Sequence, residues 1–255
     1  MKPRHGGVFL LPRYDAATIA AMINVDAQEL AKFSELAHRW WDPDSEFRPL
    51  HQINPLRLDW IDGLAGLSGK QALDVGCGGG ILAESMAANK AIVTAIDLAE
   101  GPLAVARLHQ LESGARVDYR KISAEALAAE APGRFDLVTC LEMLEHVPEP
   151  QSVVAACARL CRPGGTLLFS TINRSPLAWA TAIVGAEYVL GLLPKGTHRY
   201  DRLIRPAELA TACRSQGLKV HEITGMRYNP VSRTVRIGAA PSVNYFLHAR
   251  KPESA

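Results

Sequence analysis

The sequence has few of the features of a secreted, disulfide-stabilised protein. Its five cysteines include no Cys-x-x-Cys pair, and an odd number cannot all be paired within one chain. The apolar run that begins at Val8 stops at Pro12 and is too short for the hydrophobic region of a signal peptide. These absences favour a cytoplasmic protein with free thiols, and residues 1–25 are predicted to form a poorly ordered extension.

The sequence also lacks a strong excess of charge of either sign. It has 28 Lys and Arg residues against 26 Asp and Glu residues, a formal net charge of +2 at pH 7. Proteins that bind the phosphate backbone of DNA or RNA usually need a larger positive field, so nucleic acid is not an expected partner. A chain of 255 residues, 48% of them hydrophobic, can bury the core of one large domain, which we predict to span residues 26–255.

From Ser68-Gly69 onward, stretches with strand character alternate with stretches that have helical spacing of apolar residues. The predicted strands are 71–75, 91–97, 117–121, 135–141, 166–171, 219–225 and 243–250. The predicted helices between them are 81–89, 102–112, 124–130, 150–161 and 206–217. This order predicts an α/β, Rossmann-like fold: a mostly parallel, seven-stranded sheet with helices on both faces and an antiparallel pair at its edge.

The region before the sheet is predicted to contain two helices. Asp26, with Glu29 three residues later, has the pattern of a capped helix start, and apolar residues then recur at helical spacing as far as Asp42-Pro43, where this helix should end. A loop over residues 48–55, which contains two prolines, should lead to a second helix at 56–64.

An apolar insertion, residues 173–205, separates the fifth predicted strand from the last predicted helix. Between Pro176 and Pro194 it contains one formal charge, Glu187, and arginines flank it on both sides. A bilayer span needs about 20 consecutive apolar residues, so this run is marginal for crossing a membrane. Two interpretations stay open: a buried lid helix, or a peripheral contact of residues 174–205 with anionic lipid on the inner face of the membrane.

A glycine-rich segment, Gly76-Cys77-Gly78-Gly79-Gly80, follows the first predicted strand. Glycines let the backbone turn sharply and approach a ligand closely, because no Cβ intervenes. At the carboxyl end of a parallel strand such a loop forms a cradle for a cofactor, although it could also be a tight turn without a ligand. A dinucleotide site would need a further glycine at position 81, which is Ile81, so an NAD-dependent oxidoreductase is disfavoured.

Asp97 ends the second predicted strand, where an acidic side chain can accept hydrogen bonds from both hydroxyls of a ribose. Sites for nicotinamide cofactors and for adenosylmethionine share this placement. The acid therefore indicates an adenosine-containing ligand more than one particular cofactor.

Two segments resemble motifs of class I methyltransferases, which use S-adenosylmethionine. Residues 73–87 resemble their motif I, and residues 141–148 (LEMLEHVP) resemble the segment that follows their fourth strand. The segments Arg39-Trp40-Trp41-Asp42 and Ile53-Asn54-Pro55-Leu56-Arg57 are more specific. Over roughly residues 26–250 the chain is similar to the ubiquinone biosynthesis O-methyltransferase family.

This resemblance implies an activity and a set of partners. The family transfers a methyl group from S-adenosylmethionine to the phenolic hydroxyl of polyprenylated catechol-type intermediates, in both O-methylation steps of ubiquinone synthesis. The implied substrate is a polyprenylated phenol or quinol, and other proteins of ubiquinone biosynthesis are implied as partners. A small soluble phenol as acceptor, and a non-catalytic sensor of adenosylmethionine, are the alternatives.

The resemblance also assigns cofactor contacts. With the motif I segment, the cofactor-binding candidates are Arg57, Asp74, Gly76, Gly78, Asp97 and Leu141. A guanidinium at position 57 can hold the methionine carboxylate through two parallel hydrogen bonds. Without the resemblance, Arg57 would be interpreted as a surface residue.

Glu142, Glu145 and His146 are the catalytic candidates. Their spacing of i, i+3 and i+4 places all three on one face if the segment is helical. Three interpretations stay open. The three side chains hold a divalent metal, Mg²⁺ or Zn²⁺, that favours the phenolate form of the acceptor, which the family resemblance supports; His146 acts alone as general base; or the cluster only lines the pocket. An imidazole, with an unperturbed pKa of about 6.5, suits the second role.

Overall fold

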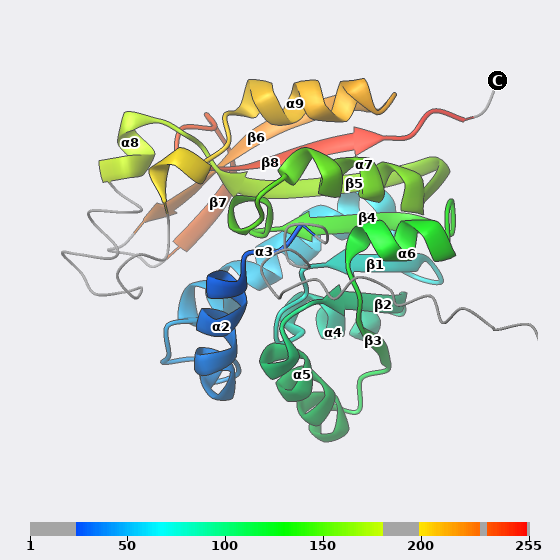
Figure 1. Ribbon diagram of the computed structural model, residues 1–255, viewed down its shortest axis with the longest axis vertical. Helices are drawn as coiled ribbons and strands as arrows, with labels where there is room; N and C mark the ends of the chain where they lie inside the picture. Colours follow the sequence, from blue (N-terminus) through cyan, green and yellow to red (C-terminus); the bar gives the residue numbers. More distant parts are fainter. Residues whose placement is uncertain (1–23, 181–198, 230–233, 254–255) are drawn as a thin grey trace, which may run out of the picture.

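The strands of the protein form one mixed sheet, drawn as arrows in Figure 1, which shows the computed structural model. The structure describes residues 24–180, 199–229 and 234–253. The strands are β1 (Gln71–Val75), β2 (Ile92–Asp97), β3 (Val117–Lys121), β4 (Phe135–Leu141), β5 (Cys161–Ile172), β6 (Lys219–Asn229), β7 (Thr234–Ala239) and β8 (Asn244–Arg250). Their order across the sheet is β3-β2-β1-β4-β5-β8-β6-β7.

The first five strands make the parallel part of the sheet. β1 pairs with β2 on one side and with β4 on the other, and β3 and β5 continue the parallel order outward. β1 and β4 are apolar and buried along most of their length, because helices cover both of their faces. Since the chain leaves β1 and β4 in opposite directions across the sheet, a crevice opens at their carboxyl ends, where ligands of this fold bind.

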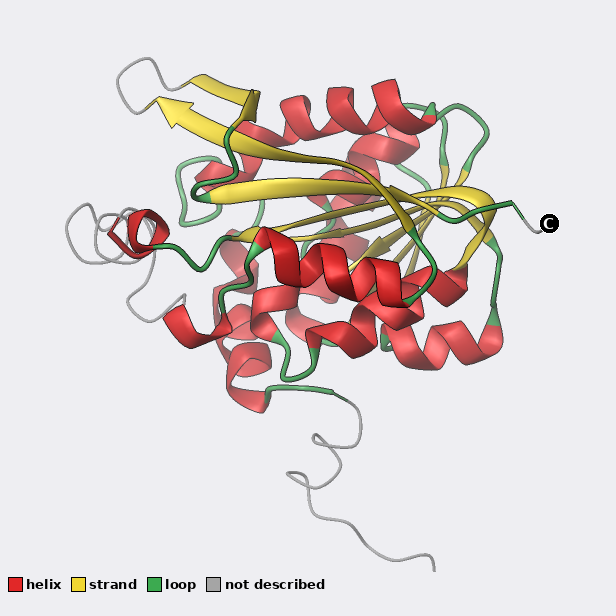
Figure 2. Cartoon of the chain, turned by 90° about the horizontal axis from the view of Figure 1, so that it is seen from above, coloured by secondary structure: helices red, strands yellow, loops and turns green. Residues whose placement is uncertain are grey.

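Helices form a layer on each face of the sheet, and Figure 2 shows the strands between the two layers. One layer contains α3 (Arg48–Ala65), α4 (Ile81–Ala88) and α5 (Glu100–Ser113), and the other contains α6 (Ala124–Glu130), α7 (Pro150–Leu160) and α9 (Pro206–Ser215). Each layer packs on its face of the sheet and buries a separate hydrophobic core. Ile61, Met86 and Leu168 are buried on the α3 side, and Phe135 and Tyr245 on the α7 side.

The C-terminal half of the sheet differs from the prediction in one strand. Among the described residues the sheet has eight strands rather than the predicted seven. The additional strand is β7, whose residues were expected to lie in a loop. Gly238, with φ of +113°, and Pro241 give this stretch the composition of a turn, yet β7 pairs antiparallel with β6 at the edge of the sheet. β8 lies inside the sheet, antiparallel to both β5 and β6.

The first helix confirms the prediction for its start. α2 (Ala27–Leu36) begins at Asp26, whose Oδ1 accepts hydrogen bonds from the backbone N–H groups of Gln28 and Glu29. A 3-10 turn, η1 (Ala37–Arg39), continues it. Figure 1 shows α2 in blue beside α3 and α5, at the carboxyl-end side of the parallel strands.

The loop predicted over residues 48–55 is wrong, because α3 already begins at Arg48. Pro49 lies in its first turn, where a missing N–H costs no helical hydrogen bond. Pro55 lies inside the helix and removes one such bond, but the neighbouring turns bury Ile53 and Ile61 against the sheet. Tertiary packing therefore overrides the helix-breaking signal of the proline.

The insertion between β5 and α9 is described only at its two ends. α8 (Pro176–Ala178) begins it, with Ser175 accepting a hydrogen bond from the N–H of Ala178, and η4 (Tyr200–Arg202) ends it. Residues 181–198 and the predicted extension up to residue 23 lie outside the described residues. Within the described parts of the chain, no helix is long and apolar enough to cross a membrane.

Candidate active site

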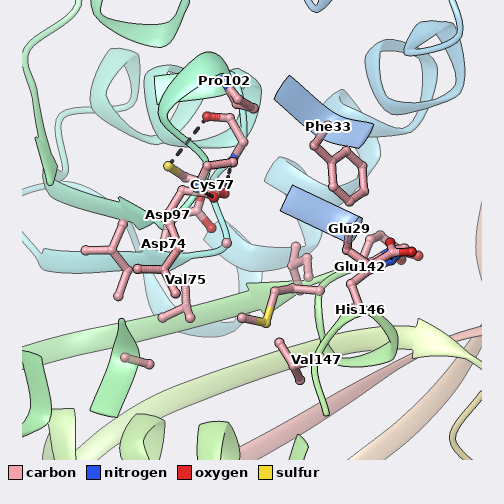
Figure 3. A pocket seen from close by; sticks show the side chains of 18 of the residues that line it. Glu29, Phe33, Asp74, Val75, Cys77, Asp97, Pro102, Glu142, His146 and Val147 are labelled. Atoms are coloured by element: carbon pink, nitrogen blue, oxygen red, sulfur yellow. Dashed lines mark hydrogen bonds and ion pairs between the residues drawn. The ribbon is translucent and has the colours of Figure 1, made fainter. Parts of the chain in front are cut away.

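A pocket lies where β1, β2 and β4 end, beneath α2. Its lining combines apolar side chains, among them Leu30, Phe33, Met143, Val147 and Val153, with acidic and basic groups. Figure 3 shows Asp74, Cys77 and Asp97 on one side of this pocket and Glu29, Glu142 and His146 on the other. The pocket thus has a strand-end side, next to the glycine loop, and a histidine side, below α2.

Two glycines of the loop after β1 line the pocket and leave no room for a side chain. Gly76 has φ of +72°, and a Cβ there would lie 2.4 Å from Cγ of Met143. Gly78 has φ of +53°, and its Cβ would lie 2.2 Å from Cζ2 of Trp40. Any side chain at either position would meet both backbone strain and a collision. The two predicted residues line the pocket with bare backbone.

Asp97 holds this loop in place. Its Oδ2 accepts a hydrogen bond from the N–H of Gly78 at 2.9 Å, and its Oδ1 accepts one from the N–H of Ala99 at 2.8 Å. Burial raises the pKa of Asp97, while hydrogen bonds from Ala99, Gly78 and Leu98 act in the opposite direction. The carboxylate thus lines the pocket directly behind the glycine loop, as the sequence predicted.

Arg57 projects from α3 into the pocket and is only 5% exposed, so its interpretation as a surface residue is wrong. Its Nε has no hydrogen-bond partner among the described residues, and its guanidinium is within 3.5 Å of Oδ1 of Asn54. Burial lowers the pKa of Arg57, whereas the charges of Glu142 and Asp74 raise it. A buried guanidinium with an unused N–H is suited to bind a carboxylate of a ligand.

Asp74, near the end of β1, is 3% exposed and lines the same pocket. Its Oδ1 accepts a hydrogen bond from the hydroxyl of Thr139 at 2.8 Å. Burial raises the pKa of Asp74 to about 6, although Thr139 and Arg57 act to lower it. Leu141, the last residue of β4, is 7% exposed and completes the predicted cofactor residues at the strand ends.

The expectation that Glu142, Glu145 and His146 share one helical face is wrong. Glu142 has φ of +53°, and only residues Leu144–His146 form a short 3-10 turn, η2. Backbone with positive φ cannot continue a right-handed helix, so the three side chains leave the chain in different directions.

Each of the three side chains has its own neighbours. Glu142 Oε1 accepts a hydrogen bond from the Ser170 hydroxyl at 2.7 Å. Glu145 is 4% exposed, and its Oε2 accepts a hydrogen bond from the Thr171 hydroxyl at 2.8 Å. Burial and the charge of Glu142 raise the pKa of Glu145 to about 7.

His146 lies at the pocket surface below α2. Its Nδ1 is 2.7 Å from Oε2 of Glu29, and its ring makes an edge contact with Phe33, with ring centres 5.1 Å apart and an interplanar angle of 88°. Both Glu29 and Phe33 belong to α2, so this helix fixes the imidazole from above.

The three predicted metal ligands do not fit a metal ion in this arrangement. Across the described residues, no three or more His, Cys, Asp and Glu side chains converge as ligands. Glu145 is 4% exposed and accepts a hydrogen bond from Thr171 outside the pocket lining, whereas Glu142 and His146 line the pocket. The residues at the strand-end side do fit the predicted cofactor, since they offer a ribose acceptor, bare loop backbone and a buried guanidinium.

Three residues of the site, Glu29, Trp40 and Trp41, were not among the predicted site residues. Glu29 was interpreted as part of a helix cap, although its position one turn before Phe33 on the apolar side of α2 could have indicated an inward direction. Trp40 is 6% exposed and covers Gly78 and Gly79, while the indole N–H of Trp41 donates to the carbonyl of Gly79 at 2.9 Å. The Trp-Trp pair thus packs on the cofactor loop.

Known proteins match this chain over most of its length. A family model described as "Methyltransferase domain" matches residues 73–169, from β1 to β5. A ubiquinone biosynthesis O-methyltransferase of Paracidovorax citrulli (strain AAC00-1) is 63% identical over 232 residues, 91% of this chain and 98% of that protein. A protein of the same name from Azotobacter vinelandii is 60% identical over 91% of this chain and 100% of its own length. The chain belongs to the ubiquinone biosynthesis O-methyltransferase family. The family predicted from the sequence is therefore confirmed.

Solved structures agree with this fold at lower identity. Magnesium protoporphyrin IX methyltransferase of Synechocystis PCC 6803, with bound SAH, is 18% identical, with a TM-score of 0.63 over 92% of this chain and 98% of that one. The [4+2]-cyclase SpnF is also 18% identical, with a TM-score of 0.61 over 96% of this chain and 99% of that one. These likenesses show the class I methyltransferase fold predicted for this ubiquinone biosynthesis O-methyltransferase family member. Because a cyclase has it too, the reaction must be argued from the site.

Proposed function

We propose that the protein transfers a methyl group from S-adenosylmethionine to a phenolic hydroxyl of polyprenylated catechol-type intermediates of ubiquinone biosynthesis. The names of the relatives support the pathway and the O-methylation. One observation of this chain carries the proposal: His146 lies across an apolar pocket from Asp97 and from Cys77 of the glycine loop. That arrangement provides a proton acceptor and a cofactor cradle on two sides of a space that suits an aromatic ring.

Six side chains and loop positions would hold the cofactor. Arg57 would bind its methionine carboxylate, Asp97 would accept hydrogen bonds from its ribose, and Gly76 and Gly78 would let the backbone approach closely. Asp74 would balance the positive charge of Arg57, and Leu141 would pack against the ligand. When bound, S-adenosylmethionine supplies an electrophilic methyl group on a sulfonium.

His146 would then act as general base. It would accept the proton of the phenolic hydroxyl as that oxygen takes the methyl group, whose bond to the sulfonium sulfur breaks with its electron pair left on sulfur. The proton would pass to water after the products leave. The apolar residues Leu30, Phe33, Met143 and Val147 exclude water and orient the acceptor ring, which keeps the oxygen in line with the methyl group. Glu142, next to Arg57, contributes negative charge near the sulfonium.

A single assay tests the reaction and its base. We expect the protein to methylate a short-chain prenylated catechol with labelled S-adenosylmethionine, and His146→Ala to lower kcat by roughly 100-fold or more. The matched control is His38→Ala, an exposed histidine in η1. No product from the wild-type protein would overturn the proposed reaction. Loss of activity on chelation that added Mg²⁺ or Zn²⁺ restores would overturn the assignment of the proton to His146 alone.

The same proposal extends to both methylation steps, an early polyprenylated phenol and a late quinol, and to other proteins of the pathway as partners. The acceptor ring would lie against the apolar side chains Leu30, Phe33, Met143 and Val147, which discriminate weakly between similar rings. We also propose that residues 174–205 contact the membrane in which a polyprenyl substrate resides. Leu177 and Trp179, at the described start of this segment, are 51% and 50% exposed.

A further inference from the structure

A carboxylate from the N-terminal helix binds the ring of the proposed base. Glu29 and His146 are separated by 117 residues, yet Oε2 of Glu29 lies 2.7 Å from Nδ1 of His146. Their side chains are 19% and 14% exposed, so water competes little for this contact. In Figure 3 Glu29 extends from α2 towards His146 at the pocket edge.

Helix capping does not explain Glu29. The N-terminal N–H groups of α2 are bound by Asp26, which accepts from Gln28 and from Glu29 itself. In a capping box the carboxylate of Glu29 would turn back to the N–H of Asp26, but here it points to His146. The side chain is therefore directed into the site rather than used for the helix.

The neighbouring charges determine the protonation state of the Glu29 carboxyl. Burial raises the pKa of Glu29, but the hydrogen bond and charge of His146, together with the charge of Lys32, lower it more, so the net pKa lies below its usual value. Other charged groups around the pair are Asp26, which is bound to Arg202, and the carboxyls Glu142 and Glu145 on the loop side. An ionised Glu29 can only accept, so Nδ1 of His146 must donate.

This geometry determines which nitrogen of His146 is basic. With the proton held on Nδ1, the neutral ring keeps its lone pair on Nε2, where a phenolic proton can be accepted. The carboxylate then stabilises the imidazolium that forms. The edge of Phe33, also on α2, restricts rotation of the ring. Glu29 and Phe33 thus hold the ring of His146 together.

We propose that Glu29 is a positioning residue of the methyl transfer, which fixes His146 in the Nδ1–H tautomer and stabilises its charged form. The proposal rests on the proposed role of His146 as general base. It assigns to α2 a chemical role besides covering the pocket.

The first test compares Glu29→Gln with Glu35→Gln, the same substitution at an exposed position of the same helix. Gln keeps the size of Glu29 and removes its charge. We expect Glu29→Gln to lower kcat roughly tenfold or more, to leave the KM for S-adenosylmethionine within about twofold, and to move the acid limb of the kcat/KM profile to lower pH by about one unit. Glu35→Gln should match the wild type. A Glu29→Gln protein with wild-type kcat and pH profile would overturn the proposal.

A double variant tests whether Glu29 acts through His146. In the His146→Ala background, Glu29→Gln should lower kcat no further, because the group that it positions is gone. A second, multiplicative loss in that background would overturn the proposal.

A measurement without turnover separates this inference from the proposed reaction. In ¹⁵N spectra of the histidine rings, assigned by the signal lost in His146→Ala, neutral His146 should carry its proton on Nδ1. Glu29→Gln should increase the Nε2–H form. Wild-type His146 in the Nε2–H form would contradict the role of Glu29, whereas absence of methyl transfer with the Nδ1–H form present would contradict only the proposed reaction.

Discussion

At the scale of single residues, Arg57 is the group on which cofactor affinity should depend. Its guanidinium is buried beside Asp74 and Glu142, and its Nε has no partner among the described residues. A buried charge with an unpaired N–H costs free energy in the empty pocket, and binding of a carboxylate offsets that cost. The binding energy of the methionine end of the cofactor is therefore concentrated at one side chain.

Substitution of Arg57 should weaken cofactor binding while the protein stays folded. We expect Arg57→Ala to raise the Kd for S-adenosylmethionine by about 10- to 100-fold, measured by calorimetry, since charged hydrogen bonds contribute about 1.5–3 kcal/mol. Arg57→Lys retains the charge but not the planar guanidinium, so its Kd should lie between those of the wild type and Arg57→Ala. Near-UV circular dichroism checks that both variants are folded. Wild-type affinity in Arg57→Lys would contradict two-point binding of the carboxylate.

Glu145 should make the stability of the protein depend on pH. Burial and the charge of Glu142 raise its pKa from the ordinary 4.5 to about 7, so the folded protein holds a proton that the unfolded chain releases at lower pH. Stability is therefore lost as pH rises between these two values. Glu145→Gln removes this loss, and its stability relative to wild type should rise by up to about 1.4 kcal/mol per pH unit between pH 5 and 7, measured by urea denaturation. If the difference in the free energy of unfolding between Glu145→Gln and the wild type did not vary with pH, the raised pKa of Glu145 would be contradicted.

At the scale of elements, α2 connects distant parts of the chain. Asp26 caps its start and, through Oδ2, accepts a hydrogen bond from Arg202 at 2.7 Å. Asn24 contacts Glu125 and the backbone of Glu149. These contacts, at sequence separations of 101 to 176 residues, fix the helix that holds Glu29 over the pocket.

The cap can be tested by a graded pair of variants. Asp26→Asn keeps an oxygen that accepts from the helix N–H groups and loses only the charge that faces Arg202. Asp26→Ala loses both and should lower the free energy of unfolding by about 1 kcal/mol, with Asp26→Asn intermediate. Hydrogen exchange of the α2 amides should rise in the same order. Asp59→Ala, at an exposed position of α3, is the control and should change neither quantity.

The elements also show where sequence patterns suffice. β1, β3 and β4 have the predicted bounds. β1 and β4 are short apolar runs and β3 alternates buried with exposed residues, and both patterns indicate strands when they lie between helices. The start of α3 and the strand β7 were missed, since Pro55 and Gly238 carry local signals that distant packing overrides.

The same limit applies to the site. The residues at the strand ends, such as Gly76 and Asp97, were found because parallel strands bring their carboxyl ends to one edge of the sheet. Glu29 has the spacing of a helix cap, and only the fold brings it to His146. The spacing of the 142–146 cluster suggested a helix, but the positive φ of Glu142 depends on its bonds to β5.

At the scale of the whole molecule, the proposed membrane contact assigns vesicle binding to the surface that contains Leu177 and Trp179. We expect the protein to sediment with vesicles of phosphatidylglycerol and phosphatidylcholine, and Leu177→Asp with Trp179→Asp to reduce the bound fraction at least about threefold, because the charges oppose burial in the interface. Leu111→Asp is the control, since Leu111 is 78% exposed on α5 and lies outside the insertion. Equal binding of all variants would refute this contact.

The position of β8 has a consequence for how the protein is made. Residues 244–250 lie between β5 and β6 in the sheet, although they follow β6 and β7 in the chain. Until a ribosome has released residues 244–250, β5 exposes an unpaired edge and β6 and β7 cannot join the parallel strands. Such an edge can pair with another nascent chain. The sheet therefore closes only after β8 has left the ribosome, and shielding of β5 by a chaperone during that interval should raise the yield of folded enzyme.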